Sequence, residues 1–73
     1  MKVNFIEHKE HLFRDDEYRD LGTKEMSVIP QQGDVIKGAK FWRVVQRTFV
    51  VTNNPDEEDY VKLFLREITR LNN

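Results

Sequence analysis

Residues 40–52 read Lys40-Phe41-Trp42-Arg43-Val44-Val45-Gln46-Arg47-Thr48-Phe49-Val50-Val51-Thr52. Seven of these thirteen residues are aromatic or β-branched apolar types, which are enriched in strands because they pack well on a pleated surface. The stretch therefore predicts one long strand, and neighbouring segments must supply hydrogen-bond partners along its whole length.

The alternation of this strand slips in its middle. Trp42 and Val44 share one face of a regular strand, whereas Phe49 and Val51 fall on the other. A bulge near Gln46–Thr48 would return both pairs to the same side, because one extra residue shifts the alternation by one. We therefore expect a long, bent strand of the kind that serves both sheets of a small barrel.

Residues 60–66 offer the strand partner. Val61, Leu63 and Leu65 alternate with Lys62, Phe64 and Arg66, and an antiparallel return across residues 53–59 closes a short loop at low entropic cost. A helix over 55–71 is the alternative, because Asn54 and Pro55 form a good helix start and the later apolar residues also fit helical spacing. The strand interpretation is favoured because Leu63 fits the strand face but not the helical face.

The first half of the chain gives weaker signals. Residues 3–7 have strand character, residues 24–29 alternate loosely up to Pro30, residues 31–34 and 37–39 read as turns, and Val35-Ile36 is a strand stub. Residues 8–21 fit either a short helix ending at Gly22 or a strand over 11–14 with a polar loop. The expected fold is a single domain over 1–73, mainly β, forming a small barrel or a strongly bent antiparallel sheet.

One stretch resembles a known class. Its pattern is Ile29-Pro30-x-x-Gly33-Asp34-x-Ile36 followed by Gly38-x-Lys40-x-Trp42-x-Val44. It is similar to small SH3-like β-barrel proteins, many of them uncharacterised products of phages and bacterial mobile elements. The resemblance covers roughly residues 26–68. It implies an SH3-like barrel and a habit of binding other molecules, and it brings no catalytic residues.

The composition excludes several classes of function. The chain has 73 residues and no cysteine, which excludes disulfides, thiol catalysis and cysteine-based metal sites. Its longest apolar runs are two or three residues, so we expect neither a membrane span nor a signal peptide. We therefore expect the protein to be cytoplasmic. So short a chain builds a marginal core, which favours stabilisation by a partner.

Charge is unevenly distributed although the net charge is −1. Residues 1–34 carry −3, residues 35–54 carry +4 and residues 55–73 carry −2. The candidate nucleic-acid-binding residues are Lys37, Lys40, Arg43 and Arg47. Phe41, Arg43 and Arg47 would share one strand face, where cations neutralise phosphates and an aromatic ring stacks on a base. The competing interpretation is an ordinary solvent-facing strand surface.

Residues that could carry catalysis or bind metal form no pattern. His8 and His11 would share a helix face, but the spacing lacks a fourth ligand, so they are expected to be surface histidines. Ser27 has no surrounding glycines of a nucleophile elbow, and no phosphate loop is present. We expect no enzymatic activity, no catalytic residue, no metal, no cofactor and no small-molecule substrate.

The apolar residues of the last segment point to a partner. If residues 60–68 form a strand, Tyr60, Phe64 and Ile68 lie on the face opposite Val61 and Leu63, and one face then exceeds what a single core needs. These three residues are the candidate protein interface. The expected function is a non-enzymatic binding module that acts through a protein partner or self-association, for example as a homodimer or a phage accessory protein. The alternative is a small nucleic-acid-binding barrel.

Overall fold

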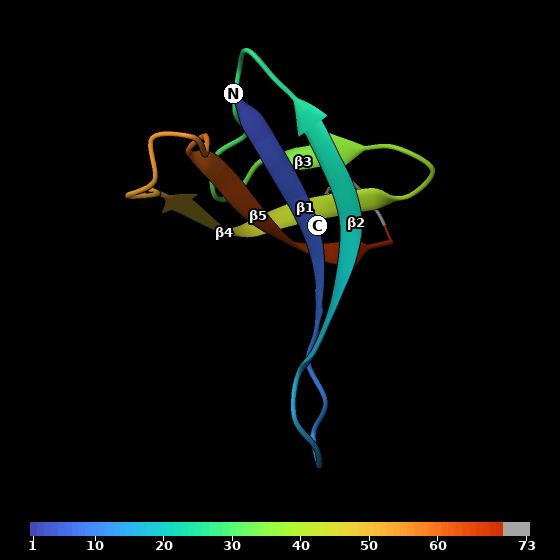
Figure 1. Ribbon diagram of the computed structural model, residues 1–73. Helices are drawn as coiled ribbons and strands as arrows, with labels where there is room; N and C mark the ends of the chain where they lie inside the picture. The colour runs from blue at the N-terminus through green and yellow to red at the C-terminus, as the bar shows by residue number, and fades with distance from the viewer. Residues whose placement is uncertain (70–73) are drawn as a thin grey trace.

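The computed structural model describes residues 1–69 and is built from strands (Figure 1). In chain order these are β1 (Lys2–Lys9), β2 (Glu17–Glu25), β3 (Val35–Lys37), β4 (Phe41–Val50) and β5 (Tyr60–Ile68). The prediction of a mainly β fold is confirmed. Both helix alternatives are wrong, because β2 begins inside 8–21 and β5 occupies the centre of 55–71.

The strands form one open sheet in the order β2-β1-β5-β4-β3. Neighbouring strands run antiparallel except β1 and β5, which are parallel, so the expected wholly antiparallel sheet is wrong at its centre. The sheet bends strongly: Figure 1 shows β1 and β2 running steeply across the direction of β3 and β4, with β5 between them. Strands β2 and β3 are the two edges.

Strand β4 bends at a bulge. Val44 lies opposite Leu65 and Gln46 lies opposite Phe64, so Val45 is the extra residue. The predicted bulge is therefore present, one position before the expected Gln46–Thr48. Its effect is the expected one, because the bulge returns Phe49 to the face that carries Val44.

Strand β5 supplies the centre of the core. Val61, Leu63 and Leu65 are buried together with Val3 and Val44, which confirms the strand alternation and the antiparallel pairing with β4. Further apolar side chains pack against this cluster, namely Phe5, Met26, Ile29, Ile36 and Trp42. All of them cover one face of the bent sheet, so its opposite face remains open to solvent.

The connection from β2 to β3 crosses the core. The loose alternation of residues 24–29 belongs to a strand only as far as Glu25, where β2 ends, and Met26 and Ile29 then pack against the core. The predicted turn over 31–34 is confirmed, with Asp34 N–H donating to Gln31 O at 3.0 Å. The backbone N–H of Gly33 then donates to Val44 O at 2.8 Å, which leads the chain into β3.

A second bulge lies in β2 at Leu21. Phe5 pairs with Gly22 and Ile6 pairs with Asp20, and Gly22 has a φ of +112°, a conformation that favours glycine. Gly22 N–H donates to Asp20 Oδ1 at 2.8 Å and the Asn4 amide donates to the same oxygen at 2.9 Å. These hydrogen bonds, that of Gly22 first, hold the pKa of Asp20 below its usual value.

Replacing Gly22 by alanine should lower the free energy of unfolding by about 1–3 kcal/mol, because a side chain is strained at positive φ although no atom lies within 4 Å of the added Cβ. Gly38→Ala is the matched control: its φ is not positive and the nearest atom is 4.0 Å away. Urea denaturation of both variants measures the difference. Equal losses in the two variants would show that backbone strain at Gly22 is not the cause.

Candidate protein-binding surface

The β1–β2 hairpin extends beyond the sheet as an arm (Figure 1). We define its loop, residues 10–16, as the hairpin tip. Leu12 is 91% exposed and Phe13 is 97% exposed, the highest values among the large apolar side chains in the described part of the chain. Burying a phenylalanine side chain away from water is favourable by about 2–3 kcal/mol. Burial of the tip against a partner would therefore contribute strongly to binding.

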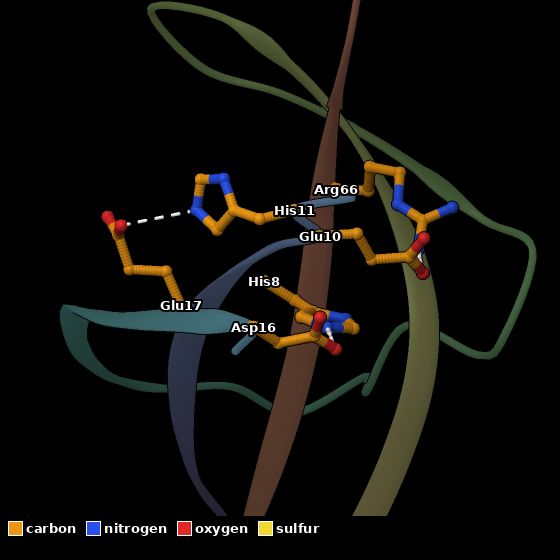
Figure 2. Close-up of polar contacts among 6 residues, drawn as sticks. All are labelled: His8, Glu10, His11, Asp16, Glu17 and Arg66. Atoms are coloured by element: carbon orange, nitrogen blue, oxygen red, sulfur yellow. Dashed lines mark hydrogen bonds and ion pairs between the residues drawn. The ribbon is translucent and has the colours of Figure 1, made fainter. Parts of the chain in front are cut away.

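Polar contacts hold this arm in shape (Figure 2). His8 Nε2 lies 2.8 Å from Asp16 Oδ2, and His11 Nε2 lies 3.2 Å from Glu17 Oε1. Arg66 of β5 reaches across to Glu10. These contacts connect the tip to strands β2 and β5. Because they already order the loop, the tip loses less conformational entropy when it binds a partner.

The two histidines do not converge on one point. Each faces a different carboxylate, His8 toward Asp16 and His11 toward Glu17, and they point to different sides of the arm in Figure 2. Within residues 1–69 there is no group of three or more histidine and carboxylate side chains that could hold a metal ion. His8 also stacks on Tyr18 at 4.8 Å between ring centroids, which is a structural role.

The predicted interface residues Tyr60, Phe64 and Ile68 lie on the solvent-side face of β5 and are half-buried. Phe64 packs edge-on against Tyr18 at 5.9 Å, so part of its surface is already covered by the aromatic stack of the arm. Ile6 and Lys62 line a shallow depression of about 380 Å³ beside Phe64. This face continues from β5 toward the arm.

The four predicted nucleic-acid-binding cations do not gather on one surface. Lys37 and Arg43 lie on the solvent-side face, whereas the bulge at Val45 turns Arg47 to the core side, opposite Leu63. The expectation that Arg47 shares a face with Arg43 is therefore wrong, because it counted a regular alternation through residue 45. Lys40 lies in the turn before β4.

Each of these cations has a contact within the chain. Arg43 donates to Gly33 O at 3.1 Å and Lys40 lies 3.4 Å from Glu67 Oε1. The ammonium of Lys37 lies 5.8 Å from the ring centroid of Phe41, and the guanidinium of Arg47 lies 5.1 Å from that of Phe49. These contacts stabilise the β3–β4 part of the sheet.

A second apolar feature lies between the two sheet edges, and we call it the edge slot. Leu21 of β2 and Ile36 of β3 form its walls together with Met26, and its floor is made of Phe5, Trp42 and Leu65. Lys24 and Lys37 stand at its margin. The slot has a volume of about 380 Å³ and lies where pairing of β2 with β3 would close the sheet into a barrel.

Sequence reasoning missed both the hairpin tip and the edge slot. Leu12-Phe13 is the single apolar pair between Lys9 and Asp20, and that isolation was a signal for an exposed anchor. The slot had no comparable signal, because its residues come from all five strands and two connections. It becomes visible only when the sheet is bent.

Comparison of the chain with protein-family models, curated proteins and solved structures finds no match. None of the described residues form a helix that is long and apolar enough to cross a membrane.

Proposed function

We propose that this protein is a small non-enzymatic module that binds another protein through its hairpin tip. The observation that carries the proposal is the near-complete exposure of Leu12 and Phe13 on an arm held by His8, His11 and Glu10. Large apolar side chains seated on a protruding, braced loop are suited to enter a pocket of a partner, where aromatic anchors contribute most of the binding energy.

The charges around the tip favour a protein over an anionic surface. Residues 10–17 carry four acids against one arginine, so phosphate-rich membranes and nucleic acids repel the tip. A pocket that is apolar inside and basic at its margin is complementary to it. The partner proposed is therefore a folded protein with such a pocket, and the proposed binding takes place in the cytoplasm.

A nucleic-acid-binding function is the weaker proposal. Lys37 and Arg43 remain on one face, but Arg47 lies on the other and Lys40 pairs with Glu67. We also propose that the protein is related to the small SH3-like barrel proteins that its sequence resembles. That likeness implies a role in a phage or a mobile element. It agrees with a binding module, although the five strands form an open sheet.

Photo-crosslinking at the tip tests the proposed function. Benzoylphenylalanine at position 13, in cells that make the protein, should give discrete protein adducts at several times the yield obtained from position 51. Val51 is the matched control because it is also apolar and 72% exposed, but it directly follows the last residue of β4 and lies away from the tip. Equal yields from positions 13 and 51 would refute binding through the tip.

A further inference from the structure

We propose that the pocket that receives the hairpin tip is the edge slot of a second copy of this chain. This inference rests on the proposed function and names the partner. The tip carries Leu12 and Phe13, which are exposed, and the slot offers an apolar floor of Phe5, Trp42 and Leu65. Each copy thus contains both halves of one contact.

The size of the slot fits the side chains of the tip. A cavity of about 150 Å³ is sufficient for a benzene ring, so a slot of about 380 Å³ has room for the phenyl ring of Phe13 and part of Leu12. Trp42 and Ile36 are only half-buried in the single chain. Insertion of the tip would cover these surfaces together with the ring of Phe13, and all of these groups leave water at once.

The charges of tip and slot are opposite. Asp15 and Asp16 follow Phe13 after Arg14, and residues 10–17 carry four acids against that one arginine, whereas Lys24 and Lys37 are among the residues that line the slot. When Phe13 enters the slot, the acidic tip comes close to Lys24, which pairs with the buried Val3 and so lies on the same face of the sheet as the slot. This favours the slot over contact with another acidic tip. Charge complementarity therefore selects the slot of a second copy over contact between two tips.

The tip cannot reach the slot of its own chain. Along β2 the wall residue Leu21 lies four positions beyond Glu17, a separation of about 13 Å, and the arm projects in the opposite direction (Figure 1). The contact must therefore form between copies. A reciprocal exchange of tips gives a closed dimer, and repeated one-way insertion gives a chain of molecules.

Sedimentation equilibrium of the purified protein at high micromolar concentration tests the inference. The wild type should exceed the monomer mass of 8.8 kDa, whereas a tip variant, Phe13→Asp, and a slot variant, Lys24→Glu/Lys37→Glu, should each be monomeric. All three altered positions are exposed, so both variants should retain the circular dichroism spectrum of the wild type. Val51→Asp is the control and should associate like the wild type.

Mixing the two variants gives the sharper result. The Phe13→Asp chain keeps an intact slot and the Lys24→Glu/Lys37→Glu chain keeps an intact tip, so an equimolar mixture should form a heterodimer through one tip–slot contact. A wild type that stays monomeric, a Phe13→Asp chain that still associates, or a mixture that stays monomeric would each overturn the inference. Adducts from position 13 to a different protein, with a monomeric wild type, would overturn this inference and leave the proposed function standing.

Discussion

Replacing Arg19 by alanine is expected to lower the free energy of unfolding by about 3 kcal/mol, although Arg19 is 62% exposed. The reason is Glu7, whose side chain is only 2% exposed on the core face of β1, opposite Leu65. Arg19 Nη2 lies 2.9 Å from Glu7 Oε1 as an ion pair, and no hydrogen bond reaches that oxygen from the described residues. Without the guanidinium the buried carboxylate has no compensating charge. We place the loss at the lower end of the range for buried pairs because water reaches Arg19.

A double variant separates this cause from a general weakening of β2. Glu7→Met removes the buried charge, so Glu7→Met/Arg19→Ala should recover most of the stability that Arg19→Ala loses in urea denaturation. Arg14→Ala is the control, since Arg14 is exposed and 3.8 Å from Glu17, and it should cost less than about 0.5 kcal/mol. If the double variant is as unstable as Arg19→Ala, the buried charge is not the source of the loss.

Leu63→Ala should be the most destabilising truncation in the core. Leu63 is fully buried in β5, between Phe5 of β1 and Arg47 of β4, and removing its side chain leaves a cavity at the centre of the sheet. Such a truncation costs about 2–5 kcal/mol, and a chain of this length has a total stability of about 4–11 kcal/mol. Thermal unfolding should therefore begin at least about 10 °C lower, or the variant should be largely unfolded.

The matched control for this truncation is Leu12→Ala. It removes the same atoms from a side chain that is 91% exposed, so its melting temperature should stay within a few degrees of the wild type. A loss of stability in Leu12→Ala comparable to that in Leu63→Ala would mean that the hairpin tip packs on its own chain. That result would also remove the basis for the proposed function.

The sequence predicts the β4–β5 part of the fold well because its signals are local. Apolar residues at alternate positions in β5, the bulge in β4 and the short loop between them can all be read from neighbouring residues. Strand β2 gives no such signal, since all nine of its residues are exposed and mostly polar. It is a strand because β1 provides hydrogen bonds along its length, and the positive φ of Gly22 then marks a bulge instead of a helix end.

The parallel pairing of β1 with β5 lies beyond any local pattern. It joins Val3 to Val61 across most of the chain and depends on the whole sheet being assembled. The candidate binding surface likewise has one part that local sequence indicates and one part that depends on the assembled sheet. Leu12 and Phe13 could be identified as exposed from their polar surroundings, but the slot depends on how far β2 and β3 stay apart, which only the bent sheet determines.

The contact between the hairpin tip and the edge slot can be measured directly by isotope-filtered NMR. In a sample that mixes carbon-13-labelled and unlabelled chains, nuclear Overhauser effects can be selected that arise only between copies. We expect such effects from the ring protons of Phe13 to the indole of Trp42 and the methyl groups of Ile36. Effects between copies that involve Tyr60, Phe64 and Ile68 and never Phe13 would contradict this expectation, because the copies would then meet through the open face of β5.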